Sequence, residues 1–128
     1  MSLNRFRSGP GRVDALRAAE RTGHLDGFPA EQDAVLLDVR ESYEWHTGHA
    51  PGAVHVPLSA LAAGAPLPER VAGLPLVVVC RSGNRSRQAA ELLVARGADA
   101  VDVIGGMRDW ARLGLPVVDR CGESGTVT

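Results

Sequence analysis

The chain has 128 residues, of which 45% are hydrophobic and 23% are charged, and its formal net charge is −1. This length suits one domain with one core, and the near-neutral charge excludes a general electrostatic attraction to nucleic acid or to an anionic membrane. Two cysteines are too few for a disulfide framework, so we expect a cytoplasmic protein with reduced thiols.

The first half of the chain alternates between helical and strand-like patterns. Residues 1–12 contain arginines but no continuous apolar segment, so we expect a flexible lead-in and not a secretory signal. Apolar residues at helical spacing and short aliphatic runs follow, and the latter are typical of buried strands. These patterns predict helices over residues 13–23, 41–49, 58–64 and 68–73, and strands over residues 34–39 and 53–57.

The second half repeats the alternation. The pattern predicts a strand over residues 76–80, a helix over 84–97, a strand over 100–106 and a helix over 107–114. Strands that alternate with helices favour an α/β fold, with a mostly parallel sheet and helices on both faces. We expect one domain over residues 13–118, followed by a polar, glycine-containing and flexible tail over 119–128.

A cysteine stands where the strand over residues 76–80 gives way to a helix. In open parallel sheets, ligands bind beyond the carboxyl ends of the strands, and a helix N-terminus offers free N–H groups and a positive dipole end. Such a place favours anions and a thiolate. No acidic residue lies between Glu69 and Glu91, whereas four arginines do: Arg70, Arg81, Arg85 and Arg87.

The residues after Cys80 suit an anion-binding loop. Gly83 allows the loop to curl so that successive amides point inward, and the polar side chains of Ser82, Asn84 and Ser86 are expected to donate hydrogen bonds or to cap the helix. The alternative is that Cys80 is only a packed apolar residue, because free cysteine is among the most buried residue types. The arginines, the glycine and the helix start favour the functional interpretation.

Three segments in this order resemble the rhodanese family: "LLDVRESYEWHTGHAPGAVHVPLSAL", "VVVCRSGNRSRQAAELLVARG" and "VIGGMRDWARLGLPV". Together they cover about residues 34–118. The resemblance implies a rhodanese-like fold, with a five-stranded parallel sheet and helices on both faces. It also implies sulfurtransferase activity, in which a cysteine takes the outer sulfur of a donor such as thiosulfate, forms a persulfide, and passes that sulfur to cyanide, a thiol or a partner protein.

On this resemblance Cys80 is the expected nucleophile of a thiosulfate sulfurtransferase. The small anionic donor is expected to bind the loop that follows, formed by Arg81, Ser82, Gly83, Asn84, Arg85 and Ser86. Four residues separate Cys80 from Arg85, whereas relatives that act on phosphate esters or arsenate resemble each other in a loop that is one residue longer. The shorter loop favours sulfur over a phosphatase or arsenate-reductase function. A non-catalytic interaction or regulatory module is the other alternative, although such modules are expected to lose the cysteine.

Other polar and aromatic residues near the predicted sheet edge are expected to support the structure and not to take part in the chemistry. Asp38 and Arg40 end the strand over residues 34–39 and are expected to support the site, Asp38 by bracing loops and Arg40 by a local ion pair, for instance with Glu44. His46, His49 and His55 match no compact zinc pattern, so no metal and no cofactor is expected. Trp45 and Trp110 are expected to pack in the core or at its rim, and Cys121 to be a bystander thiol in the tail.

Overall fold

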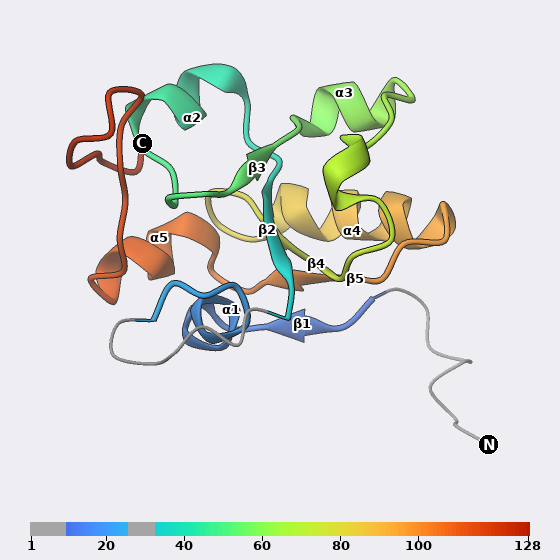
Figure 1. The fold of residues 1–128 in the computed structure, drawn as a ribbon, viewed down its shortest axis with the longest axis horizontal. Coiled ribbons are helices and arrows are strands. Elements are labelled where there is room, and N and C mark those ends of the chain that lie inside the picture. The colour runs from blue at the N-terminus through green and yellow to red at the C-terminus, as the bar shows by residue number, and fades with distance from the viewer. Residues whose placement is uncertain (1–9, 26–32) are drawn as a thin grey trace.

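The computed structural model describes residues 10–25 and 33–128, and within them five strands and five α-helices alternate along the chain (Figure 1). The strands are β1 (Arg12–Val13), β2 (Val35–Asp38), β3 (Val54–His55), β4 (Leu76–Val79) and β5 (Ala100–Val103). The α-helices are α1 (Ala15–Arg21), α2 (Ser42–Thr47), α3 (Leu58–Ala62), α4 (Asn84–Ala95) and α5 (Gly106–Arg112), and a short 3-10 helix spans Glu69–Val71.

All five strands join one parallel sheet in the order β1-β5-β4-β2-β3, which confirms the predicted α/β architecture. The sheet order reverses direction between β2 and β4, and such switch points are where ligands bind in open α/β folds. The register sets Asp38 beside Val79. Cys80 therefore follows β4 at the same sheet edge where β2 ends.

One strand was missing from the predicted elements. Residues 13–23 were expected to be helical throughout, but Val13 belongs to β1 and the helix begins only at Ala15. The reason is local: the Asp14 side chain accepts a hydrogen bond from the Arg17 N–H at 2.8 Å and so caps the helix. Arg12, the last residue of the expected lead-in, pairs in register with Asp102 of β5.

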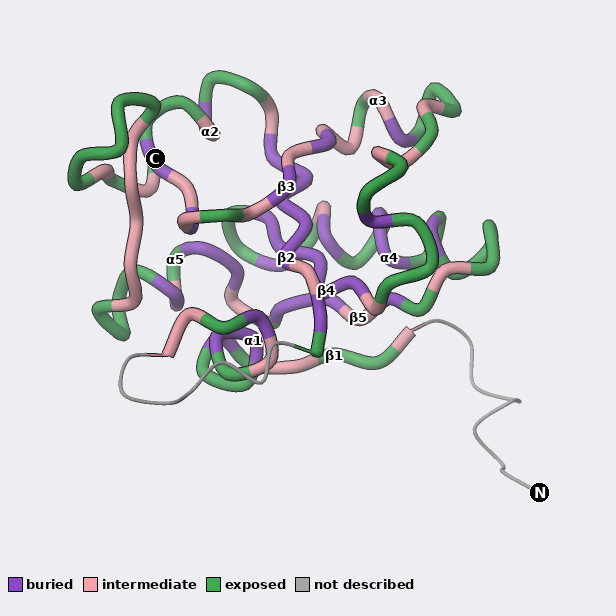
Figure 2. Tube along the Cα trace, in the orientation of Figure 1, coloured by how far each residue is buried: buried purple, intermediate pink, exposed green. Residues whose placement is uncertain are grey.

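The core lies on both faces of the sheet, and Figure 2 shows the buried segments gathered along the strands. Helices α3 and α4 cover one face, where Leu61 and Leu93 pack against β2 and β4. Helices α1 and α5 cover the other face, where Ala18 and Trp110 are fully buried. The alternation of side chains along each strand sends neighbouring aliphatic residues to opposite faces, so β4 is buried throughout.

The segment after α5 returns along the carboxyl edge of the sheet. Val118 forms an antiparallel bridge with His49, and the Thr126 N–H donates to the Thr47 carbonyl at 3.1 Å. A Cβ on Gly48 would lie 2.3 Å from the Thr126 carbonyl oxygen, so a glycine permits this close approach. The segment thus lies beside α2, while the flexibility expected for residues 119–128 remains a prediction. Residues 1–9, also expected to be flexible, lie outside the described residues.

No helix in residues 10–25 or 33–128 has the length and apolarity needed to cross a membrane.

Candidate active site

Cys80 directly follows β4, at the carboxyl edge of the sheet, and is 1% exposed. Its sulfur is held by polar groups although it adjoins the apolar cluster beneath α4. The Gly83 N–H donates to Sγ at 3.1 Å, and the thiol donates to the Ser86 hydroxyl oxygen at 3.3 Å. The interpretation of Cys80 as purely apolar packing therefore does not account for its surroundings.

The loop after Cys80 turns through Gly83, which has a φ of 110° and is the N-cap of α4. Only glycine adopts this conformation without strain, and a Cβ there would also lie 3.1 Å from Arg12 Nη2. Ser82, Asn84 and Ser86 were expected to donate hydrogen bonds or to cap the helix. No side-chain hydrogen bond caps α4, whereas the Ser86 hydroxyl does donate a hydrogen bond, to Asp102. The turn instead directs the Gly83 N–H at the sulfur.

A second backbone segment supports the loop from α5. The Met107 N–H donates to the Cys80 carbonyl at 2.8 Å, and the Arg108 N–H donates to the Arg81 carbonyl at 3.0 Å. A Cβ on Gly106 would lie 2.4 Å from the Cys80 carbonyl oxygen, so this approach requires a glycine. The first turn of α5 thus binds the Cys80 and Arg81 carbonyls and fixes the backbone of the loop at these two residues.

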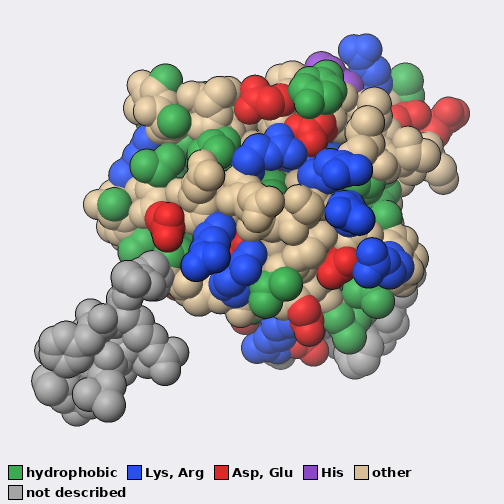
Figure 3. Space-filling view, turned by 180° about the vertical axis from the view of Figure 1, so that it is seen from behind, with side chains coloured by type: hydrophobic (Ala, Val, Ile, Leu, Met, Phe, Trp, Pro, Cys, Tyr) green, Lys and Arg blue, Asp and Glu red, His purple; other side chains and the backbone are tan. Residues whose placement is uncertain are grey.

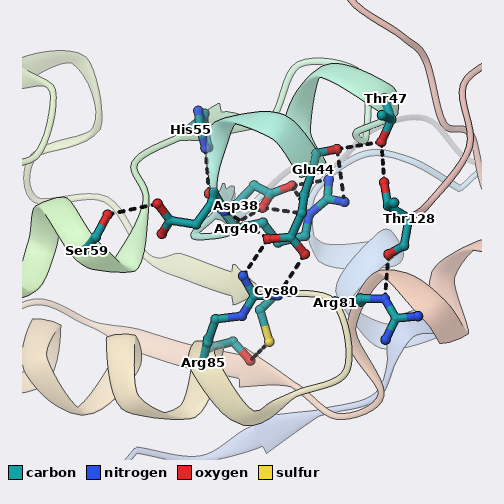
Figure 4. A network of polar contacts seen from close by, with 12 residues as sticks. Asp38, Arg40, Glu44, Thr47, His55, Ser59, Cys80, Arg81, Arg85 and Thr128 are labelled. Atoms are coloured by element: carbon teal, nitrogen blue, oxygen red, sulfur yellow. Dashed lines mark hydrogen bonds and ion pairs between the residues drawn. The ribbon is translucent and has the colours of Figure 1, made fainter.

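Arg85 points from α4 to α2, where it forms a two-point ion pair with Glu44 (Figure 4). Its Nη1 and Nη2 donate to the two carboxylate oxygens at 2.5 and 2.8 Å. The Arg85 hydrogen bonds lower the pKa of the Glu44 carboxyl, against the opposing effect of burial. The pKa of Arg85 is raised, first by these hydrogen bonds and to a smaller degree by attraction to Cys80. Sequence reasoning did not place Glu44 at the site.

A second ion pair is connected to the sulfur through Ser86. Ser86 is buried, and its hydroxyl donates to Asp102 Oδ2 at 3.0 Å. Arg12 Nε donates to Asp102 Oδ1 at 2.9 Å and Nη2 to Oδ2 at 3.1 Å. The pKa of Arg12 is raised, chiefly by the Asp102 hydrogen bond and least by attraction to Cys80. Asp102 is fully buried, and neither it nor Arg12 was among the candidate residues.

The strand registers explain how these distant residues meet. Arg12 lies beside Asp102, and Asp102 lies beside Val78, two residues before Cys80. Adjacent parallel strands carry their in-register side chains on the same face, and α4 covers that face at Ser86. The sequence did contain one signal, because Asp102 is a charged residue inside an aliphatic strand. A buried carboxylate requires a partner, so a nearby cation could have been expected.

Asp38 and Arg40 form a fully buried pair rather than lining the sulfur. Arg40 Nη2 donates to Asp38 Oδ2 at 2.8 Å and to the Gly48 carbonyl at 2.7 Å. The local ion pair expected for Arg40 is present, but its partner is Asp38 and not the suggested Glu44, whose carboxylate binds Arg85. Arg40 instead reaches the Glu44 backbone carbonyl, at 3.5 Å. The pair ties β2 to the turn after α2.

The remaining loop residues face solvent. Arg81, Ser82 and Asn84 are exposed, and Arg81 Nε donates to the Thr128 backbone oxygen at 2.5 Å. The Thr128 hydroxyl in turn lies 2.5 Å from the Thr47 hydroxyl (Figure 4). The Arg81 side chain is therefore directed along the rim of the site towards the end of the chain.

The histidines and tryptophans near the site form a stacked group and a core contact. Trp45 stacks on His49 and on His55, with ring centroids 3.6 and 4.7 Å apart, and Trp110 is buried with its Nε1 donating to the Pro116 carbonyl at 2.8 Å. His55 Nε2 lies 2.7 Å from the Arg40 carbonyl oxygen. Over the described ranges, no group of three or more His, Cys, Asp or Glu side chains is arranged to hold a metal ion.

Figure 3 shows the molecule from behind, and both basic and acidic side chains lie on the face that it shows. All basic side chains are arginines, and they are interspersed with carboxylates over this face.

This geometry suits nucleophilic chemistry at sulfur. The Cys80 sulfur has a backbone donor and a hydroxyl at hydrogen-bond distance, and two guanidinium groups lie near enough to attract a negative sulfur. Fixed donors and cations around one atom stabilise charge that develops there during a reaction. In the described part of the chain, every buried side-chain nitrogen and oxygen has a hydrogen-bond partner.

Comparison with known proteins gives a consistent family. A family model described as "Rhodanese-like domain" matches residues 23–113. Among solved structures, the chain is similar to a rhodanese-related protein from Thermoplasma volcanium, with a TM-score of 0.70 and 31% sequence identity. That alignment covers 84% of this chain and 97% of the other.

Two curated relatives are longer proteins. The chain is 35% identical over 82 residues to the "Putative sulfur carrier protein YrkF" of Bacillus subtilis, which covers 63% of this chain and 43% of that protein. It is 37% identical over 78 residues to the "Adenylyltransferase and sulfurtransferase UBA4" of Yarrowia lipolytica, covering 61% of this chain and 20% of that protein. The chain thus spans less than half the length of these relatives.

Proposed function

The chain belongs to the rhodanese-like domain family, and on this basis we propose that it is a sulfurtransferase that carries sulfur on Cys80. The observation that carries the proposal is the sulfur of Cys80 at the carboxyl edge of β4, where it accepts the Gly83 N–H and lies beside the Ser86 hydroxyl. Relatives named as a sulfur carrier and a sulfurtransferase support the same chemistry.

The proposed reaction consists of two displacements. The Cys80 thiolate attacks the outer sulfur of thiosulfate; a new S–S bond forms, the original S–S bond breaks, and sulfite leaves with the electron pair. The persulfide, which carries the negative charge on its outer sulfur, is then attacked by cyanide or a thiolate. Its outer sulfur leaves with the acceptor, and the Cys80 thiolate is restored. Covalent catalysis of this kind divides one transfer into two easier steps.

The loop residues take roles that follow from their positions. The Gly83 N–H stabilises charge on Sγ, and Arg85 supplies positive charge beside the donor anion. Arg81, Ser82 and Asn84 lie at the exposed rim, where the donor and the acceptor enter. A partner protein as the acceptor belongs to the same proposal, since the relatives include a protein named as a sulfur carrier. We also propose a cytoplasmic location, because two cysteines are too few for a disulfide framework.

The first test is sulfur loading with thiosulfate, followed by intact mass spectrometry. The wild type is expected to gain the mass of one sulfur atom, which peptide mapping assigns to Cys80, and to release thiocyanate when cyanide is added. Cys80→Ser is expected to abolish both.

Cys121→Ser provides the matched control, because Cys121 is the other free cysteine and is exposed. This variant is expected to load and transfer sulfur as the wild type does. Loading on Cys121, or hydrolysis of an aryl phosphate faster than sulfur transfer, would contradict the proposal. The second result would also refute the argument from loop length.

A further inference from the structure

The Cys80 sulfur is part of a closed ring of hydrogen bonds whose five members are Cys80, Ser86, Asp102, Arg12 and Gly83. Sγ accepts the Gly83 N–H and contacts the Ser86 hydroxyl, which donates to Asp102. Arg12 completes the ring, because it binds both Asp102 oxygens and its Nη2 also donates to the Gly83 carbonyl at 3.0 Å. The two groups that touch the sulfur, Gly83 and Ser86, are therefore joined to each other through one partly buried ion pair, in which Asp102 is buried and Arg12 is one-third exposed.

The number of available protons limits what this ring can do. The contacts from Sγ to Ser86 and from Ser86 to Asp102 are two hydrogen bonds and need two protons. A serine hydroxyl supplies one, and an ionised carboxylate supplies none. The thiol of Cys80 supplies the second. Both hydrogen bonds exist together only while the sulfur carries a proton.

In the proposed reaction, the sulfur loses that proton. A thiolate has no S–H, and Sγ of a persulfide has none either, so the Ser86 oxygen and the sulfur would face each other without a proton between them. The repulsion is removed if the Ser86 hydroxyl turns from Asp102 to Sγ. Asp102 tolerates this loss because Arg12 still binds both of its oxygens, and the carboxylate is not left unpaired.

We propose that the Ser86 hydroxyl alternates between Asp102 and Cys80, and that Asp102 and Arg12 are positioning residues that set this choice. The hydroxyl points to Asp102 when Cys80 is a thiol and to Sγ when Cys80 is a thiolate or a persulfide. Arg12 keeps Asp102 in place in both states, and through the Gly83 carbonyl it also keeps the Gly83 N–H directed at the sulfur. The arrangement inferred for the persulfide rests on the proposed function, whereas the arrangement inferred for the thiol does not.

The arrangement inferred for the thiol, in which Cys80 donates to Ser86, is tested by infrared spectroscopy of the S–H stretch. The Cys121→Ser variant is used as the background, so that Cys80 gives the only band. A thiol that donates a hydrogen bond absorbs at lower wavenumber than a free one. We expect a low band in this background protein and a higher band in Ser86→Ala, which lacks the acceptor. Identical bands in the two proteins, or no S–H band from acid to neutral pH, would overturn the inference.

Asp102→Asn tests the positioning role. An Asn at this position can accept only one of the two Arg12 hydrogen bonds. Arg12 Nη2 also donates to the Gly83 carbonyl, whereas Nε donates to the Oδ1 position, so we expect the Asn oxygen at Oδ1 and its amide group facing Ser86, where it donates to the hydroxyl oxygen. The hydroxyl is then free to donate to Sγ, the thiol loses its acceptor, and the band is expected to rise as in Ser86→Ala. Asp38→Asn is the matched control, because it alters a buried carboxylate–arginine pair outside the ring and is expected to leave the band unchanged. A shift of equal size in the control would show a general structural effect and refute the inference.

Kinetics of sulfur loading separate the two variants. Ser86→Ala removes a donor to the charged sulfur and is expected to slow loading about tenfold, at the lower end for loss of a donor at a reacting centre. Asp102→Asn keeps the hydroxyl free for Sγ and is expected to load at least as fast as the wild type. Equal slowing of both variants would overturn the inference. If no protein loads sulfur, the proposed function fails, and the S–H bands still decide the hydrogen-bond arrangement.

Discussion

The Glu44–Arg85 and Asp102–Arg12 ion pairs near Cys80 are buried to a similar degree, but they differ in the hydrogen bonds that connect them to the sulfur. The carboxylate side chains of Glu44 and Asp102 are 4% and 0% exposed, and their partners Arg85 and Arg12 are 32% and 33% exposed. For Arg85, attraction to Cys80 is one of the lesser causes of its raised pKa. Asp102 reaches the sulfur through Ser86, and Arg12 reaches Gly83, the other group that touches it. Two ion pairs of similar burial and equal charge therefore influence the Cys80 sulfur differently, because only the Asp102–Arg12 pair is joined to it through hydrogen bonds.

The largest expected difference between the pairs is in stability. Asp102→Ala leaves the buried Ser86 hydroxyl without its acceptor and Arg12 without its carboxylate, and is expected to lower the free energy of unfolding by about 3 kcal/mol. Glu44→Ala frees Arg85, which can turn to solvent, and is expected to cost about 1.5 kcal/mol. Urea unfolding monitored by circular dichroism measures both. Equal losses would mean that the connection through Ser86 adds nothing to stability.

A smaller effect is expected on the binding of the sulfur donor thiosulfate when Glu44 is replaced. In the free protein, Arg85 is bound by Glu44 at two points, so a bound anion competes with that carboxylate for the guanidinium. Glu44→Gln keeps the shape and removes the competing charge, and is expected to lower the KM for thiosulfate about threefold to tenfold, roughly 1 kcal/mol. Steady-state thiocyanate formation measures it. An increased KM would show that Glu44 instead holds Arg85 in the position that binding requires.

The part of the site that follows one local pattern was predictable from sequence. Cys80, Gly83, Arg85 and Ser86 belong to one strand–loop–helix segment, and the spacing alone places them together. The alternation of strands and helices likewise predicted the parallel sheet. Local patterns determine these features because the participating residues are neighbours along the chain.

The partners of this segment could not be predicted in the same way. Arg12 and Asp102 are 90 residues apart and meet only because β1 and β5 pair in one register, and β1 was too short to give an alternating pattern. Glu44 was assigned to Arg40 by sequence proximity, but the buried Arg40 already binds the nearer Asp38. Competition between carboxylates for one guanidinium is decided by tertiary geometry, which local spacing does not contain.

The smallest expected effect is the pH dependence of the Glu44 pair. Arg85 holds the pKa of Glu44 below its ordinary value of 4.5, so the unfolded chain binds a proton at this carboxyl at higher pH than the folded protein does. The stabilisation by the pair is therefore fully present above pH 4.5 and is lost as the pH falls through the lower folded-state pKa. We expect it to amount to at most about 1 kcal/mol, because Arg85 is one-third exposed and solvent screens the interaction.

The difference in unfolding free energy between the wild type and Glu44→Gln, measured by urea titration at a series of pH values, is expected to be constant above pH 4.5 and to shrink below it. Glu20→Gln, which removes an exposed carboxylate paired with Arg17 on α1, is the matched control and is expected to change stability little at any pH. Gln is still able to accept the hydrogen bond that the Glu41 N–H donates to Glu44 Oε1, so the comparison isolates the charge of Glu44. A Glu44 difference that persists unchanged into acid would therefore contradict the assignment of this stabilisation to the ion pair with Arg85.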